Sequence, residues 1–323
     1  MSLADDIRPR SSSHGLARRR FLASGAALLT GAPLGALAAS DCGTADAAAA
    51  ADPGPTVRPA PLQHAAREAL AALSDVKLWY WDTGGAGEPI VLLHPFTGSA
   101  RVWTFQQPAF AAAGYRVIGY SRRGFQNSER GPAERPGTGA EDLHGLLEAL
   151  GIGRFHAVAS AGGAFVAADY AFSHPDRLLS LTIACSILGI QDPELSSLMS
   201  GLHTPDFDKL PAYLRELGPS YRAIDPQGTQ RWRELQASSM PGEPLQQPFA
   251  NALTLRALEQ LTPPVLMICG DADLIAPPPV MRRLAQHTAH SELHILPECG
   301  HSAYWERPDL FNATVLKFLQ RVG

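Results

Sequence analysis

The stretch Val158-Ala159-Ser160-Ala161-Gly162-Gly163 joins an apolar run to an Ala-rich run. Residues 155–159 predict a short buried strand, and the residues from 164 onward predict a helix packed on a sheet. Ser160 would then lie on the tight turn between them, where a serine side chain is exposed as a nucleophile. The two glycines allow the helix to begin close to the strand, and the Ala161 N–H would face a developing oxyanion. Because any doubly wound sheet contains turns of small residues, the serine needs partners elsewhere in the chain.

Two partners follow downstream, each just after a predicted strand. Residues 265–269 form an apolar run that leads into Gly270-Asp271-Ala272-Asp273, and residues 292–296 lead into Pro297-Glu298-Cys299-Gly300-His301. Open α/β sheets place ligands and catalytic groups beyond the C-terminal ends of their strands. Of the eleven histidines, only His301 lies in a loop after the last predicted strand with a glycine before it. Serine, acid and histidine therefore occur in the chain order of an α/β acyl-transfer triad.

A loop in the N-terminal half supplies the expected electrostatic element. Residues 90–93 predict a buried strand that runs into His94-Pro95-Phe96-Thr97-Gly98. A loop at this place can aim the Phe96 N–H at the same point as the Ala161 N–H. Loss of one such donor typically costs about 100- to 1000-fold in rate, so Phe96 and Ala161 are the candidate oxyanion-hole residues.

These segments, together with Tyr120-Ser121-Arg122-Arg123-Gly124-Phe125 and residues 300–308, resemble the α/β-hydrolase superfamily. The resemblance is to the cap-bearing branch of esterases, lactonases, cofactor-free haloperoxidases and epoxide hydrolases, and it runs from about residue 77 to the C-terminus. It implies an α/β fold with a mostly parallel, doubly wound sheet and a helical cap insertion. It also implies a triad of Ser160, Asp273 and His301, because the orienting carboxylate of relatives usually lies three residues after the glycine that ends the strand. Asp271 is then a turn or capping residue.

Three positions depart from the pattern of that family. Val158 stands two residues before the serine, where glycine is usual, and a side chain there crowds the strained turn. Pro95 replaces the glycine of the usual His-Gly pair, which removes one N–H but leaves that of Phe96. Ser121 stands where relatives often carry aspartate, and this change alters a structural loop more than the chemistry.

The identity of the nucleophile narrows the range of possible reactions. Haloalkane dehalogenases and soluble epoxide hydrolases of this fold use aspartate, so Ser160 argues against both. The leading prediction is a hydrolase of carboxylic esters or lactones, in which Ser160 attacks the carbonyl and His301 accepts its proton and later activates water. The same triad would serve a perhydrolase (a cofactor-free haloperoxidase) or a C–C bond hydrolase. A further hypothesis is a non-catalytic ligand-binding protein, in which Val158 has spoiled the elbow.

The chain divides into a leader, a linker, a core and a cap. Residues 188–251 have a helical pattern punctuated by prolines, and the resemblance implies that they form a cap over the serine. The predicted core then consists of residues 76–187 and 252–323. Residues 48–75 are predicted to be a linker and an N-terminal helix, and residues 1–47 a leader.

Aromatic residues near the catalytic loops are the candidate pocket residues. Phe96, Trp103 and Tyr304 flank those loops, and Trp232 lies in the predicted cap. They indicate a small-molecule ester or lactone with an apolar or aromatic acyl group. Arg122 and Arg123 are predicted to pin a loop rather than to bind an anionic substrate.

The first fifty residues differ in character from the rest. Ala17-Arg18-Arg19-Arg20-Phe21-Leu22 precedes a moderately apolar stretch that reaches Ala39, and it resembles a twin-arginine export signal. We therefore expect a periplasmic or secreted protein. The alternative is a basic, Ala-rich leader that is never cleaved. Neither the leader nor the Ala/Pro-rich residues 45–61 are expected to enter the fold.

The composition argues against several other classes of protein. A chain of 323 residues, 45% hydrophobic and 18% charged, is long enough for one domain of this class with an insertion. A formal net charge of -4 gives no reason to expect nucleic acid as a partner. We expect no metal, no cofactor and no stable membrane span after removal of the leader. The oligomeric state stays open, as does the pairing of Cys269 with Cys299, for which buried thiols are the default expectation.

Overall fold

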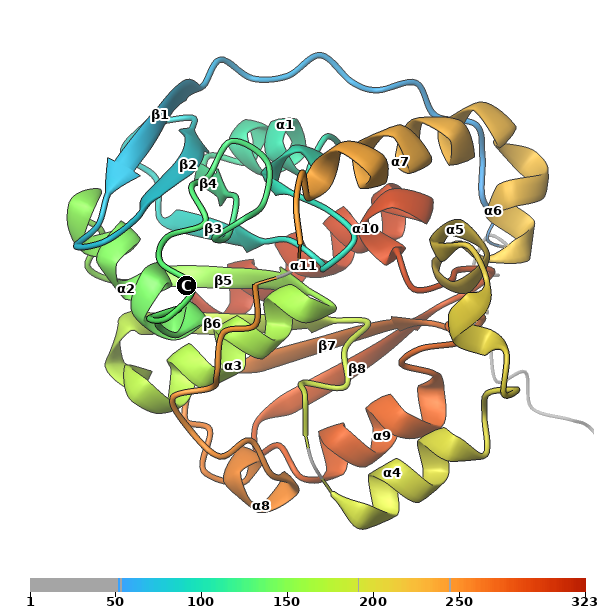
Figure 1. Ribbon diagram of the computed structural model, residues 1–323. Coiled ribbons are helices and arrows are strands. Elements are labelled where there is room, and N and C mark those ends of the chain that lie inside the picture. Colours follow the sequence, from blue (N-terminus) through green and yellow to red (C-terminus); the bar gives the residue numbers. More distant parts are fainter. Residues whose placement is uncertain (1–51, 53, 191, 244) are drawn as a thin grey trace, which may run out of the picture. The chain divides into compact units, whose positions relative to one another are not determined.

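Eight strands form one sheet in the computed structural model, which describes residues 52, 54–190, 192–243 and 245–323 (Figure 1). The strand order is β1-β2-β4-β3-β5-β6-β7-β8. The first two strands are antiparallel to their neighbours, and the others are parallel. The bounds are β1 Arg67–Ala72, β2 Lys77–Asp82, β3 Pro89–Leu93, β4 Arg116–Tyr120, β5 Phe155–Ser160, β6 Leu178–Ala184, β7 Val265–Gly270 and β8 Ser291–Leu296.

The central strands have the sequence of strands buried on both faces. β5 and β7 are buried along their whole length, and apart from His156 they consist of apolar and small residues rather than of alternating polar ones. Their register aligns the ends of the parallel strands, because Leu93 pairs with Ala159 and Ser160 pairs with Ala184. The mostly parallel sheet expected from the sequence is confirmed, and its C-terminal edge brings the predicted catalytic loops together.

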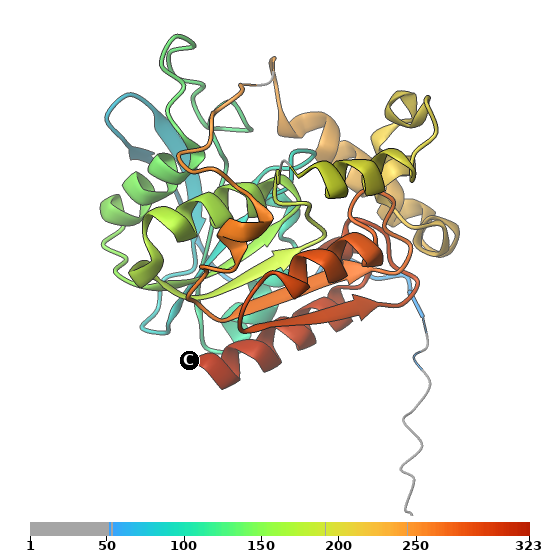
Figure 2. The same cartoon turned by 90° about the horizontal axis from the view of Figure 1, so that it is seen from below.

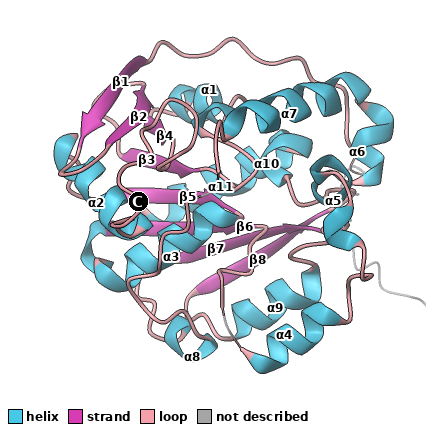
Figure 3. Cartoon of the chain, viewed as in Figure 1, coloured by secondary structure: helices cyan, strands magenta, loops and turns pink. Residues whose placement is uncertain are grey.

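Helices cover both faces of the sheet (Figure 3). One hydrophobic cluster joins the sheet to α2, α3 and α9, and a second joins it to α1, α10 and α11. Their bounds are α1 Gln106–Ala112, α2 Gly139–Ala149, α3 Gly162–Ser173, α9 Pro278–Gln286, α10 Ala303–Glu306 and α11 Pro308–Val322. Short connections contain η1 Ala100–Val102, η2 Pro175–Arg177 and α8 Leu255–Leu258.

The predicted insertion at residues 188–251 contains helices. They are α4 Pro193–Ser200, η3 Phe207–Lys209, α5 Ala212–Glu216, α6 Pro219–Ile224 and α7 Pro226–Ser239. Three of these helices begin with proline, which is tolerated in the first turn because the first N–H groups have no intrahelical acceptor. Figure 2 shows the cap helices, in yellow and light orange, on the side toward which the arrows of β7 and β8 point.

The N-terminal segment differs from the expectation in two respects. The helix predicted within residues 48–75 is wrong, since residues 67–72 form β1, which pairs along its whole length with β2. The expectation that residues 45–61 stay out of the fold is also wrong for Asp52. Its carboxylate accepts two hydrogen bonds from the buried Arg307, at 2.9 and 2.6 Å. The predicted leader, residues 1–47, lies outside the described residues.

Two further features concern the pairing of the cysteines and the length of the helices. Cys185, Cys269 and Cys299 are buried free thiols, so Cys269 and Cys299 are not paired. Within the described ranges, no helix combines the length and the apolar character needed to span a membrane.

Candidate active site

His301 and Asp273 form a buried hydrogen-bonded pair at the C-terminal edge of the sheet. His301 lies in the loop after β8, and its Nδ1 is 3.0 and 2.9 Å from the two carboxylate oxygens of Asp273, which follows β7. The N–H groups of Ile275 and Ala276 also donate to Asp273 Oδ1, each at 2.8 Å. Asp271 instead accepts the N–H of Cys299 at 3.2 Å. Asp273 is therefore the carboxylate that orients the imidazole, and Asp271 holds the loop.

The pair shifts both pKa values in the directions of an ion pair. Burial lowers the pKa of His301, but the charge and hydrogen bond of Asp273, with the charges of Glu216 and Glu306, outweigh burial and raise the pKa above 6.5. Burial raises the pKa of Asp273, yet the charge and hydrogen bond of His301 and the two backbone N–H donors lower it overall. The site therefore favours an imidazolium beside a carboxylate once His301 has accepted a proton.

The turn after β5 places a different residue at its strained position from the one the sequence predicts. β5 ends at Ser160, and Ala161 has φ 48° and ψ −116°, outside the regions that non-glycine residues ordinarily adopt. The next two positions are glycines because α3 begins in close contact with neighbouring segments. A Cβ at Gly162 would lie 2.2 Å from the Phe96 ring, and one at Gly163 would lie 2.1 Å from the Leu93 carbonyl oxygen. The elbow forms as predicted, but its left-handed residue is Ala161.

Ser160 is a strand residue whose side chain points into the protein. Side chains alternate along a strand, and Ala159 belongs to the first hydrophobic cluster whereas Val158 belongs to the second. Ser160 therefore shares the face of Val158. Its Oγ is buried and has no hydrogen-bond partner among the described residues, His301 included. The small residue that the elbow needs two places before the turn is Ala159, so Val158 does not prevent the elbow from forming.

The prediction that the Ala161 N–H serves an oxyanion hole is wrong. That N–H donates to the carbonyl oxygen of Ala184 on β6, at 2.9 Å, so it continues the sheet. The next N–H belongs to Gly162, the first residue of α3, where backbone donors have no intrahelical acceptor. The N–H groups of Gly162 and Phe96 have no acceptor within the described part of the chain, and both residues line one cavity. The oxyanion-hole donors that the geometry offers are therefore Phe96 and Gly162.

This catalytic cavity has a volume of about 290 Å³ and is lined by His301, Ala161, Phe96 and Gly162 among others. The cap contributes Glu216, which ends α5 and is buried. Thr97 Oγ1 donates to Glu216 Oε2 at 2.8 Å, and burial raises the pKa of this carboxyl. No sequence signal indicated Glu216, because its position depends on how the cap folds back over the sheet.

Cys185, directly after β6, is a second lining residue that the sequence did not single out. Its Sγ and the ligand atoms of Asp273 and His301 lie within 4.8 Å of one another. Burial raises the pKa of its thiol well above 9.0, and the charge of Asp273 adds to that effect. Because the thiolate is the reactive form, Cys185 is kept unreactive.

Three predicted pocket residues belong to the hydrophobic core instead. Trp103 and Tyr304 contact each other with ring centroids 5.0 Å apart, and Trp232 is equally buried. All three belong to the second hydrophobic cluster, and none lines the catalytic cavity. Large aromatic side chains near a catalytic loop fill the space beneath it, so the pocket prediction is wrong for these three, whereas Phe96 lines the cavity.

Known proteins resemble this chain in sequence and in structure. The model of the Alpha/beta hydrolase family matches residues 90–314. A 2-hydroxy-6-oxononadienedioate/2-hydroxy-6-oxononatrienedioate hydrolase of Burkholderia vietnamiensis is 30% identical over 272 residues, which cover 77% of this chain and 92% of the relative. A thermophilic esterase of Thermogutta terrifontis has a similar structure, with a TM-score of 0.66 and 23% identity over 79% of this chain and 99% of the other. A bromoperoxidase of Bacillus anthracis has a TM-score of 0.63 and 23% identity over 79% and 100%.

Proposed function

Since the chain belongs to the alpha/beta hydrolase family, we propose that it hydrolyses a carboxylic ester or lactone by direct attack of water, with His301 as the general base. One observation carries the proposal. The left-handed residue of the elbow, which lines the same cavity as His301, is Ala161. A methyl group there supplies no nucleophile and leaves room for a water molecule.

The proposed reaction uses groups that are already in place. His301 Nε2 takes a proton from water, the oxygen attacks the carbonyl carbon, and the imidazolium is stabilised by Asp273. The developing oxyanion accepts hydrogen bonds from the N–H groups of Phe96 and Gly162. His301 then gives the proton to the leaving oxygen as the C–O bond breaks. Water and ester become acid and alcohol, and no acyl-enzyme forms.

Substitutions and a covalent probe test this route. His301→Gln is expected to lower kcat by about 10²- to 10⁴-fold on an acyl ester that the wild type hydrolyses. Ser160→Ala is expected to retain turnover, because its hydroxyl does not contact the histidine. A fluorophosphonate probe is expected to leave the wild type unmodified and to label Ala161→Ser at residue 161, where a hydroxyl would face the base.

The opposite pattern supports the serine route. If the wild type is labelled at Ser160 and Ser160→Ala loses turnover, an acyl-enzyme forms and attack by water is wrong. Mass spectrometry of the labelled peptide separates residues 160 and 161.

A C–C bond hydrolase is the second candidate, favoured by the relative of Burkholderia vietnamiensis. Its name specifies an oxo, hydroxy dioate, and it is 30% identical over 92% of its length. The same base and oxyanion donors would hydrate a ketone before a C–C bond breaks. A panel of esters, lactones, vinylogous diketones, and peroxide with halide separates hydrolysis, C–C cleavage and perhydrolysis. Absence of turnover on the whole panel would support a ligand-binding protein.

A further inference from the structure

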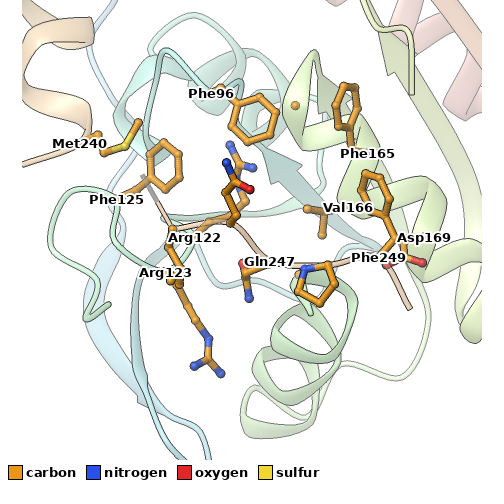
Figure 4. A pocket seen from close by; sticks show the side chains of 15 residues that line it. Phe96, Arg122, Arg123, Phe125, Phe165, Val166, Asp169, Met240, Gln247 and Phe249 are labelled. Carbon is orange, nitrogen blue, oxygen red and sulfur yellow. The ribbon is translucent and has the colours of Figure 1, made fainter. Parts of the chain in front are cut away.

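A second, larger cavity adjoins the catalytic one. It has a volume of about 400 Å³, and its walls include Phe96, Gly162 and Phe165, which also line the catalytic cavity. The rings of Phe96 and Phe165 contact each other edge to face, with centroids 5.7 Å apart, where the two cavities meet. Figure 4 shows Phe96, Phe125, Phe165 and Phe249 around this space, with Arg122 among them. We refer to it below as the aromatic cavity.

Arg122 is a buried charged residue in the wall of the aromatic cavity. Its side chain is buried, and its guanidinium lies 4.6 Å from the ring centroids of both Phe96 and Phe125. Nη2 donates to the carbonyl oxygens of His94 and Pro95, at 3.2 Å each, and Nε is buried without a partner. Within the described residues these two carbonyl oxygens are the acceptors of the guanidinium, so most of its five N–H donors have no acceptor there.

The charge of Arg122 is not balanced by the described part of the protein. Its sequence neighbour Arg123 is bonded to Asp75 and twice to Asp142, each at 2.7 Å. Arg122 has no carboxylate within 4.0 Å in the described ranges. Burial lowers its pKa to about 10, which still leaves the group charged at neutral pH. Buried charges are ordinarily paired, because an unpaired one loses the free energy of hydration.

The other charged groups around the cavities limit where an anion can lie. Asp169 is in the wall of the aromatic cavity, but the N–H groups of Ala250 and Asn251 and the Asn251 amide already donate to its carboxylate. Glu216 is in the wall of the catalytic cavity, where it disfavours an anion. Arg215 also lines the catalytic cavity, but it lies 3.7 Å from the carboxylate of Asp208. Among the arginines in these two walls, Arg122 has no carboxylate within 4.0 Å in the described ranges, so an anionic group of a ligand is attracted toward it.

We propose that Arg122 binds a carboxylate at the far end of the substrate's acyl chain, so that the substrate is a monoester or lactone of an acid with a second carboxyl group. The ester carbonyl lies in the catalytic cavity, the methylene chain contacts the rings of Phe96 and Phe165, and the carboxylate lies in the aromatic cavity. The sequence predicts that both arginines pin a loop. Arg122 does hold the loop at His94 and Pro95 through its two carbonyl contacts. In the proposal it has a second role, as a specificity residue. This inference rests on the proposed function.

Esters that differ only at the chain end test the proposal. Mono-4-nitrophenyl esters of the dicarboxylic acids from succinate to suberate are compared with 4-nitrophenyl alkanoates of equal acyl length. We expect the wild type to give a higher kcat/KM on one or more of the carboxylate esters. Arg122→Gln should lower the ratio of carboxylate to alkanoate kcat/KM by about 10-fold or more, as expected for a lost hydrogen bond to a charged group. Arg122→Lys should restore part of the ratio.

Arg135→Gln is the matched control, because it removes one positive charge from an exposed position in the same half of the chain. Its ratio should equal that of the wild type. Equal kcat/KM of the wild type for both series at every length would overturn the proposal without recourse to any variant. An unchanged ratio in Arg122→Gln would overturn it as well.

Direct binding separates this proposal from the proposed function. Adipate binding is measured by calorimetry on the wild type and on Arg122→Gln, with circular dichroism as the check on folding. If no ester is hydrolysed but adipate binds about 10-fold more weakly to Arg122→Gln, the function is wrong and the carboxylate site stands. If adipate binds equally to both proteins, the carboxylate site is wrong.

Discussion

The elbow forms at Ala161 although this residue provides no nucleophile, because hydrogen bonds of its backbone hold the turn. A positive φ at a non-glycine residue costs on the order of 1–3 kcal/mol, so it persists only when its surroundings hold it. The N–H of Ala161 donates to Ala184, and its carbonyl oxygen accepts from Ser186 Oγ at 2.8 Å and from the Ala164 N–H at 3.1 Å. The turn is therefore held from both sides by its backbone. A serine introduced at residue 161 would inherit this geometry unchanged.

The pH dependence of turnover is expected to follow the protonation of His301. Only neutral imidazole accepts a proton, so activity is expected to rise with pH through the pKa of His301. Because the Asp273 pair raises that pKa against the effect of burial, the acid limb should have its midpoint above pH 6.5. A profile of kcat/KM against pH measures it directly, and a midpoint at or below 6.5 would contradict the ion pair.

Asp273→Asn supplies the control for that profile. The substitution removes the charge that raises the pKa of His301 and leaves burial, which lowers it. The acid limb should move to lower pH while kcat decreases, since the imidazolium is no longer stabilised. A limb that stays in place would show that a group other than His301 titrates.

The loop between β8 and α10 is held to the cap by one buried carboxylate. Glu306 accepts hydrogen bonds from the N–H groups of Gly218, Gly300 and Ser302, at 2.7, 2.9 and 3.1 Å. The His301 N–H donates to the carbonyl oxygen of Glu216 at 2.6 Å. Burial raises the pKa of Glu306 to about 7, against the effect of the three donors. Glu306 is therefore a positioning residue for the histidine loop.

Glu306→Gln is expected to destabilise the protein by about 1–3 kcal/mol, because an amide NH₂ replaces one oxygen and at least one of the three N–H donors loses its acceptor. Urea unfolding measures the loss, and a lower kcat at unchanged KM would report the misplaced histidine. The exposed Glu134→Gln, which loses the same charge, should match the wild type. Equal stability of Glu306→Gln and Glu134→Gln would show that the carboxylate does not hold the loop.

The whole described unit includes a segment that the composition assigns to a linker. Asp52 is bonded to Arg307 through both carboxylate oxygens, and Arg307 is buried at the start of α11. Arg307 also donates to the carbonyl oxygen of Pro297 at 2.8 Å and lies 3.5 Å from Asp309. The segment that begins at Asp52 is therefore part of the folded unit, although it precedes the sheet.

A chain that begins at residue 52 should be more stable than one that begins at residue 60, because the shorter chain leaves Arg307 without its bidentate partner. The midpoint of urea unfolding is expected to be lower for the shorter chain, and Asp52→Asn in the longer chain should give part of the same decrease. Equal midpoints would show that the contact adds nothing. We propose from the sequence resemblance that the leader is cleaved on export, and N-terminal sequencing of the mature protein should then give a start at or before Asp52.

The sequence alone determined central strands of the sheet and their order along the chain, but not β1, for which it predicted a helix. The apolar runs at residues 90–93, 155–159 and 265–269 correspond to strands β3, β5 and β7, because strands buried on both faces need such runs. The acids after β7 and the Gly-His pair after β8 were also visible in the sequence, but the resemblance to the family was needed to choose Asp273 over Asp271 as the partner of His301. These are local patterns, and each depends on a few neighbouring residues.

Only the tertiary structure decided which atom of each loop faces the site. Whether Ser160 or Ala161 takes the left-handed turn depends on where the ladder between β5 and β6 ends, and the bond from Ala161 to Ala184 sets that point. Glu216 enters the cavity from a helix 119 residues away from Thr97, its hydrogen-bond donor. Arg122 and Arg123 are adjacent in sequence, yet among the residues that the structure describes only Arg123 contacts carboxylates. Register, long-range contacts and charge balance depend on residues far apart in the chain, so a local pattern cannot specify them.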